Sequence, residues 1–114
     1  MGLSHQERNV IANVVKYNTE PFTYDRNHPD FADLSREQYL MVAKLTAILR
    51  IANALDRSHK QKCKDAVISV RDKELVISVQ TQEDLALEKV TLHDREEFFE
   101  EVFNLHPVLK QKKR

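Results

Sequence analysis

The stretch LSREQYLMVAKLTAILRIANALDRSH, residues 34–59, contains neither Gly nor Pro and decides the fold of the first half of the chain. Ser35 followed by Gln38 has the spacing of a capping box, which predicts one long helix from Ser35 to about Arg57. Apolar residues cover more than one stripe of this helix, so it should have packing partners on several sides. One short companion helix cannot cover that surface. We therefore expect part of it to pack against chain beyond these 114 residues.

A second helix is predicted before this stretch. Ser4 and Glu7 form another capping box, and apolar residues recur at three- and four-residue steps, which predicts a helix from Ser4 to Asn18. Residues 19–34 contain two prolines and are predicted to be a loop. A loop this long usually packs on its neighbours. Four of its side chains should fold back onto the helices: Phe22, Tyr24, Phe31 and Leu34.

After the long helix the apolar pattern changes to a period of two. Residues 58–64, together with Arg57, form a basic connector. Residues 66–71 and 75–80 then alternate apolar and polar side chains on either side of Asp72–Lys73, which predicts a β-hairpin.

The last part of the chain is predicted to be a helix followed by a strand. Residues 84–104 are mostly helical in pattern, with two alternative starts. Asp84 can begin the helix early, or Asp94 can begin it late, with residues 85–92 partly extended. A short edge strand is predicted after Pro107, and the charged residues 110–114 should fray.

Together these elements predict an α+β fold. Two main helices form the first half, and a β-hairpin, a helix and an edge strand form the second. The change of pattern predicts a helical domain over residues 1–59, a connector over residues 60–64, and a small α+β domain over residues 65–114.

The composition excludes several classes of protein. Lys plus Arg number 18 and Asp plus Glu number 18, so no overall charge favours nucleic acid or an anionic membrane. No apolar run is long enough for a membrane span, and no signal peptide is present, so a soluble, cytoplasmic protein is expected. The single cysteine excludes an internal disulfide framework, and the single glycine excludes a glycine-rich phosphate loop.

Polar residues near the end of the long helix are the first candidate site. Arg50, Asn53 and either Asp56 or Arg57 are three or four positions apart, so they share one helix face. One interpretation is an anion or metal site shared with another part of the protein. The other is an internal salt bridge that orients the helix, and this is the interpretation that the sequence favours.

The connector is the second candidate site. It is basic: Arg57, His59, Lys60, Lys62 and Lys64. Such a segment attracts a polyanion such as polyphosphate or RNA, but no aromatic residue is interleaved to stack on bases, which argues against nucleic acid. A solvated basic loop is the simpler interpretation.

The remaining reactive side chains have plain interpretations. The five histidines lack metal-ligand spacing and are expected at the surface or at caps: His5, His28, His59, His93 and His106. Four glutamates should form the solvated face of the last helix: Glu96, Glu97, Glu100 and Glu101. Cys63 is expected to be unreactive.

Three stretches together resemble a known family. They are GLSHQERNVIANVVKYN (residues 2–18), LSREQYLMVAKLTAILRIANALDRSH (34–59) and LEKVTLHDREEFFEEVFN (87–104). They are similar to the C-terminal region of the exopolyphosphatase and guanosine pentaphosphate phosphatase (Ppx/GppA) family. In that family an actin-like region holds the phosphohydrolase site, and an HD-like helical domain and a small α+β domain follow.

The resemblance implies a role for this chain. Residues 1–59 would be the last helices of the HD-like domain, and the actin-like region and the earlier HD segment would lie outside the chain. We expect an accessory fragment of a phosphohydrolase that binds polyphosphate or another phosphate polyanion, forms a homodimer and is inactive alone. The alternative is part of an HD-type, metal-dependent phosphohydrolase site.

The resemblance also implies which residues act. Arg50, Arg57 and His59 match the family's helix-end motif, and with Lys60 they form the predicted phosphate-contact face. The HD pattern has an Asp where this chain has Asn53, and the family often has a His where it has Asn18. A neutral amide is a poorer ligand for a hard cation. No cofactor is therefore expected in the fragment, Asn53 and Asp56 are weak metal candidates, and Mg²⁺ or Mn²⁺ is left to the parent protein.

Overall fold

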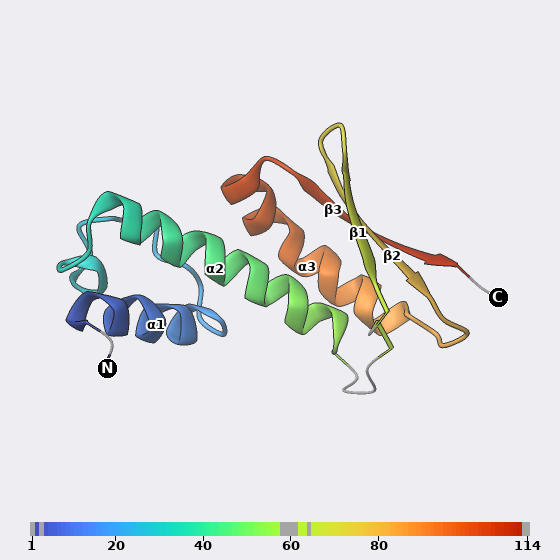
Figure 1. Cartoon of the computed structure of the whole chain (residues 1–114), viewed down its shortest axis with the longest axis horizontal. Coiled ribbons are helices and arrows are strands. Elements are labelled where there is room, and N and C mark those ends of the chain that lie inside the picture. The colour runs from blue at the N-terminus through green and yellow to red at the C-terminus, as the bar shows by residue number, and fades with distance from the viewer. Residues whose placement is uncertain (1, 3, 58–61, 64, 113–114) are drawn as a thin grey trace. The chain divides into compact units, whose positions relative to one another are not determined.

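The structure is a computed structural model that describes residues 2, 4–57, 62–63 and 65–112. It divides into two compact units, residues 1–49 (unit 1) and residues 50–114 (unit 2), and the boundary falls within helix α2 (Arg36–Leu55). The described residues form three α-helices and one three-stranded sheet, which confirms the α+β prediction (Figure 1). None of these helices combines the length and hydropathy that crossing a bilayer requires. The predicted domain limits at residues 59 and 65 stay a prediction.

Both predicted capping boxes are present in unit 1. At the start of α1 (His5–Tyr17), the Ser4 hydroxyl accepts a hydrogen bond from the Glu7 N–H (3.1 Å), and the Glu7 carboxylate accepts one from the Ser4 N–H (3.2 Å). Ser35 and Gln38 make the same pair of contacts at the start of α2, at 3.1 and 2.9 Å. Local sequence therefore defines where both helices begin.

Aromatic side chains attach the long loop of unit 1 to its two helices. The loop contains a short 3-10 helix, η1 (Pro29–Phe31). The ring of Phe31 lies edge-on to Tyr39 of α2, with centroids 4.9 Å apart, and 5.7 Å from the ring of Tyr17 in α1. Phe22 lies 5.2 Å from Tyr17. The loop is therefore part of the core of unit 1.

The prediction for the loop's apolar residues is confirmed for three of the four. Phe22, Phe31 and Leu34 are buried. Tyr24 is exposed, although its ring lies edge-on to that of Phe22 at 5.7 Å.

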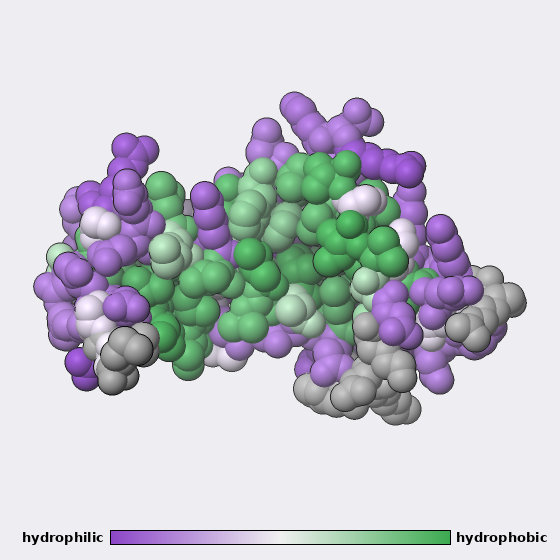
Figure 2. Space-filling view, in the orientation of Figure 1, coloured by the Kyte–Doolittle hydropathy of each residue, from purple (hydrophilic) through white to green (hydrophobic). Residues whose placement is uncertain are grey.

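Helix α2 is buried along one side only within unit 1. Val42, Ala43 and Ala47 are buried, whereas the apolar side chains on other sides of the helix are exposed: Leu40, Met41, Leu45 and Ile48. Figure 2 shows apolar side chains gathered at the surface over α2. The other residues of unit 1 therefore leave these sides of α2 uncovered.

The predicted β-hairpin is present in unit 2. Strands β1 (Val67–Arg71) and β2 (Glu74–Gln80) are antiparallel, and Arg71 pairs with Glu74 across a two-residue turn. Asp72 in this turn has a φ of 54°. Asp tolerates this left-handed conformation better than most residues, so the turn forms without glycine.

Helix α3 (Ala86–Phe103) begins just after Asp84, the earlier of the two predicted starts, and not at Asp94. The Asp84 carboxylate accepts a hydrogen bond from the Ala86 N–H (3.0 Å), so the helix already exists before Asp94. The interpretation that residues 85–92 are partly extended is wrong over residues 86–92. Asn104 ends the helix in the left-handed conformation, with a φ of 55°.

Strand β3 (His106–Lys112) lies at an edge of the sheet, as predicted, and α3 packs against it. It pairs in parallel with β2, with Ile77 opposite Leu109, so β2, α3 and β3 form a β–α–β unit. The expectation that the tail frays is wrong for residues 110–112, because they belong to β3. Residues 113–114 lie outside the described residues.

Candidate functional site

The residues of the predicted site at the end of α2 differ in burial. Arg50 packs against α3, and the others that the structure describes are exposed. The guanidinium of Arg50 lies 4.9 Å from the centre of the Phe98 ring in α3, and Arg50 is half-buried. A guanidinium over an aromatic face is attracted by the electrons of the ring. This contact ties the last turns of α2 to α3 within unit 2, which agrees with an orienting role for Arg50.

Arg57 is an exposed positive charge at this end of α2. It follows α2 directly, in the turn after Leu55, and Asn53 and Asp56 are exposed beside it. The Asp56 N–H donates to the Asn53 carbonyl (3.2 Å), which closes the end of the helix. His59 and Lys60, the other two predicted contact residues, lie outside the described residues. Among the residues that the structure describes, no three His, Cys, Asp or Glu side chains are grouped so as to hold a metal ion.

Lys62 of the connector is not a solvated loop lysine. Its ammonium donates to the Asp84 carbonyl (2.7 Å) and lies 3.5 Å from Glu88 Oε1. The Glu88 side chain is fully buried, and that of Lys62 is nearly so. A buried carboxylate needs a compensating cation. Lys62 therefore stabilises unit 2 and is not directed at a ligand.

Cys63 lies beside this buried pair. Burial raises the pKa of the Cys63 thiol, and the nearby carboxylates of Glu88 and Asp56 raise it further. A raised pKa keeps the thiol protonated at neutral pH, and a thiol is a weak nucleophile. The electrostatics thus agree with the expectation that Cys63 is unreactive.

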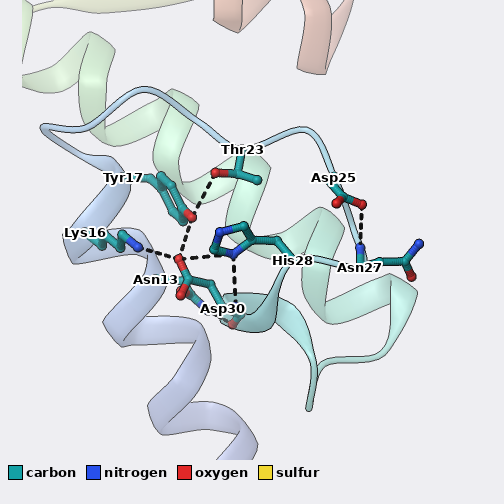
Figure 3. Close-up of polar contacts among 8 residues, drawn as sticks. All are labelled: Asn13, Lys16, Tyr17, Thr23, Asp25, Asn27, His28 and Asp30. Carbon is teal, nitrogen blue, oxygen red and sulfur yellow. Dashed lines mark hydrogen bonds and ion pairs between the residues drawn. The ribbon is translucent and has the colours of Figure 1, made fainter.

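A polar cluster around Asp30 in unit 1 is the feature that the sequence prediction missed. Figure 3 shows Lys16 and Tyr17, from α1, pointing at the carboxylate of Asp30 in η1. The Lys16 ammonium lies 2.5 Å from Asp30 Oδ2, and the Tyr17 hydroxyl donates to the same oxygen at 2.6 Å. Tyr17 also shares a hydrogen bond with Thr23 (3.1 Å), and Asn13 donates to the Asp30 carbonyl (2.8 Å).

The electrostatics of the Asp30 cluster indicate a structural role. We call Asp30, Lys16 and Tyr17 the lock, because they hold the loop against α1. Hydrogen bonds from Lys16 and then Tyr17 lower the pKa of the Asp30 carboxyl, and the Asp30 hydrogen bond raises the pKa of Lys16. Burial, followed by the bond to Asp30, raises the pKa of Tyr17. A carboxylate with a lowered pKa is a weak general base. Its role is to fasten the loop to α1.

A polar cavity of about 300 Å³ adjoins this lock. His5, Asn9, Asp30 and Asp33 contribute polar groups to its lining, and His5 Nε2 lies 3.5 Å from Asp33 Oδ2. Two carboxylates in the lining repel an anion. The lining of this cavity therefore disfavours a phosphate group.

The comparison with protein families identifies what these two units belong to. A family model described as Ppx/GppA phosphatase, domain III, matches residues 1–100. The chain belongs to the Ppx/GppA phosphatase family. A comparison with curated proteins found no match.

The domain III match spans both units and ends before β3. It includes α1, α2, the β-hairpin and most of α3. It also includes the two positions where the chain differs from the HD pattern. Asn18 is the C-cap of α1, where its N–H donates to the Val14 carbonyl (3.0 Å), and Asn53 is exposed on α2. Asn53 thus stands where the resemblance leads us to expect the Asp of the HD pattern, and Asn18 stands where the family often has a His.

Proposed function

We propose that this chain is an accessory domain of a Ppx/GppA-like protein that binds inorganic polyphosphate or a similar phosphate polyanion and has no phosphatase activity alone. Binding would use the segment that begins at Arg57 and continues through His59 and Lys60. On this proposal, catalysis belongs to the actin-like region of the parent protein, and this domain holds the substrate chain beside it.

The observation that carries the proposal is the exposed Arg57 at the end of α2 in a Ppx/GppA domain III. Five residues among positions 57–64 are Arg, Lys or His, which is a high local density of positive charge in a chain with no net charge. Phosphate chains are bound largely through such charges. Arg50 contributes indirectly, because its contact with Phe98 orients the helix end from which the segment starts. Lys62 is committed to Glu88 and is not part of the proposed contact.

Titration of the 114-residue chain with long-chain polyphosphate, at low and at high salt, tests the binding. Affinity should fall as salt rises, because the contacts are between exposed charges. Arg57→Ala and Lys60→Ala should each weaken binding by about threefold to fivefold at low salt. Lys73→Ala, in the exposed hairpin turn, is the matched control and should leave affinity unchanged. A flat titration at low salt, or an equal loss in Lys73→Ala, would contradict the proposal.

A phosphate-release assay and elemental analysis test the second half of the proposal. The purified chain should release no phosphate from polyphosphate. Release that follows the chain through every purification step would contradict this. Stoichiometric metal in chain purified from cells grown with manganese and zinc would instead support the HD-type alternative, which requires a bound divalent cation.

A further inference from the structure

The two edges of the three-stranded sheet in unit 2 differ in how they are protected. Edge strands expose unpaired backbone groups, and proteins commonly protect them with proline and lysine. β3 carries Pro107, Lys110 and Lys112. β1, at the other edge, has the sequence Val-Ile-Ser-Val over residues 67–70 and contains neither proline nor lysine.

β1 is also exposed on both of its faces. Val67 is 67% exposed on one face, and Ile68 and Val70 are 61% and 60% exposed on the other. Ile68 and Val70 lie on the same face of the sheet as the buried Ile77, because Ile68 pairs with Ile77 across the hairpin. Figure 2 shows apolar side chains gathered at the surface over the sheet. An apolar strand in this position is suited to pairing with another strand.

The hairpin fixes which backbone groups are available for such pairing. In a two-residue hairpin the residues next to the turn, Arg71 and Glu74, form a hydrogen-bonded pair, and bonded pairs then alternate along the strand. Ser69 and Val67 therefore direct their N–H and C=O groups at β2. Those of Ile68 and Val70 point away from β2, toward the open edge.

The charges that flank the apolar residues of β1 identify the strand that complements it, which is β1 itself. Arg71 ends β1, and Asp65 lies in the turn two residues before β1 begins. If two copies of β1 pair antiparallel with Ile68 opposite Ile68, then Arg71 of each copy lies opposite Asp65 of the other. Both residues are exposed. Opposite charges placed directly across an antiparallel pair are favourable. The same register places Val70 opposite Ala66, so the apolar residues meet on the face that carries Ile77.

We propose that the open edge of β1 is the interface between two copies of this chain, paired antiparallel about Ile68 into a continuous six-stranded sheet. The family resemblance implies a homodimer without locating its contact, and this inference gives the contact a place and a register. It does not rest on polyphosphate binding, because no residue of β1 belongs to the proposed phosphate contact.

Sedimentation of the 114-residue chain over a concentration series tests the interface. The wild-type chain should be dimeric, and Ile68→Lys should weaken dimerisation at least about tenfold, because it places two ammonium groups opposite each other. Val15→Lys, at an exposed valine on α1 in unit 1, is the matched control, and this variant should remain dimeric. A monomeric wild-type chain, or a dimer that Ile68→Lys leaves intact, would overturn the proposal. Ile68→Lys should keep the affinity of each chain for tripolyphosphate, which separates this result from a failure of the proposed function.

A charge exchange tests the register. Asp65→Arg and Arg71→Asp should each weaken the dimer, because each places like charges across the strand pair, and the double variant should restore it. Circular dichroism checks that each variant keeps its secondary structure. If the double variant is as weak as the single ones, the register is wrong.

Disulfide trapping gives an independent measure of the same register. In a Cys63→Ser background, Ile68→Cys should form a cross-linked dimer readily under mild oxidation, since the two sulfurs lie opposite each other across the two-fold axis. Ser69→Cys should cross-link much more slowly, because its neighbour across the pair is Val67. Faster cross-linking through position 69 would overturn the proposed pairing.

Discussion

Each unit of this protein contains a lysine–carboxylate pair, and the two pairs differ in burial more than in chemistry. In unit 1, Lys16 lies 2.5 Å from Asp30, with side chains 38% and 25% exposed. In unit 2, Lys62 lies 3.5 Å from Glu88, with side chains 12% and 0% exposed. The shorter pair is thus the more solvated one. Water screens the charges of an exposed pair, so removing one partner there costs little, whereas a buried carboxylate that loses its cation is left in a medium of low dielectric constant.

The comparison separates what each pair does for the protein. In unit 1, the neutral Tyr17 also donates to Asp30, so the loop stays attached by more than the ion pair. In unit 2, Lys62 connects the segment after α2 to the first turn of α3 through Asp84 and Glu88. We therefore expect burial, and not the distance between the charges, to rank the effects of the following changes.

Removing the Lys62 ammonium should have the largest effect. Lys62→Ala leaves the Glu88 carboxylate buried without this cation, and we expect the free energy of unfolding to fall by about 3 kcal/mol. Urea denaturation, followed by circular dichroism, measures it. Lys73→Ala, in the exposed hairpin turn, is the control and should change stability by no more than about 0.5 kcal/mol.

A double variant shows whether the uncompensated charge causes this loss. Lys62→Met with Glu88→Leu removes both charges and keeps the volume, so it should recover most of the stability. If Lys62→Ala is as stable as the wild-type chain, the Glu88 carboxylate is compensated by other groups, and burial does not rank the two pairs.

Removing the Tyr17 hydroxyl should have an intermediate effect. Tyr17→Phe keeps the ring among its aromatic neighbours and removes one hydrogen bond to the Asp30 carboxylate, which should cost about 1.5 kcal/mol near neutral pH. Tyr39→Phe, in the same aromatic cluster, is the control and should cost less, because the Tyr39 hydroxyl makes no hydrogen bond to Asp30.

The cost of Tyr17→Phe should also depend on pH. The pKa of Asp30 is lowered in the folded chain, so its stabilising effect is present above the unfolded value of about 3.9 and is lost as the pH falls through the folded value. The wild-type and Tyr17→Phe chains should therefore converge in stability in strong acid. A difference that stays constant down to low pH would show that the hydroxyl acts by packing alone.

Local features of the fold could be predicted from the sequence. Ser4 with Glu7 and Ser35 with Gln38 begin their helices as predicted, because a capping box involves residues only three positions apart. The hairpin turn at Asp72 was predicted for the same reason. The parallel pairing of β2 with β3 was not, because it depends on a helix crossing between strands, which no local pattern specifies.

The candidate sites show the same limit. Tyr17 and Asp30 are 13 positions apart, and neither spacing nor composition indicates that they meet. Lys62 belongs to a basic run that is typical of a solvated loop, and only the packing of Glu88 against it reveals a structural role. The contact of Arg50 with Phe98 likewise joins two helices far apart in the sequence. The phosphate-contact face of Arg57, His59 and Lys60 stays a prediction.

Breaking the pair between His106 and Glu100 should have the smallest effect on stability, because this pair is more exposed than Lys16–Asp30 and Lys62–Glu88. The sequence predicts that Glu100 lies on the solvated face of α3. In the structure Glu100 hydrogen-bonds to His106 at the start of β3, with both side chains more than 40% exposed. This bond raises the pKa of His106 in the folded chain, with smaller contributions from Glu96 and Glu74, while burial lowers it. A raised pKa means that the stabilisation is full below the unfolded value of about 6.5 and is lost as the pH rises through the folded value.

Replacing His106 should therefore matter only on the acid side. His106→Asn should cost no more than about 0.5 kcal/mol at pH 6, because water screens the pair, and close to nothing at pH 9. Urea denaturation at the two pH values measures the difference. His93→Asn is the control. His93 lies 3.0 Å from Glu96 within α3, and its side chain is even more exposed than that of His106, so this variant should change stability less. A loss at pH 6 as large as that of Lys62→Ala would show that contact between β3 and α3, and not burial of charge, controls the stability of unit 2.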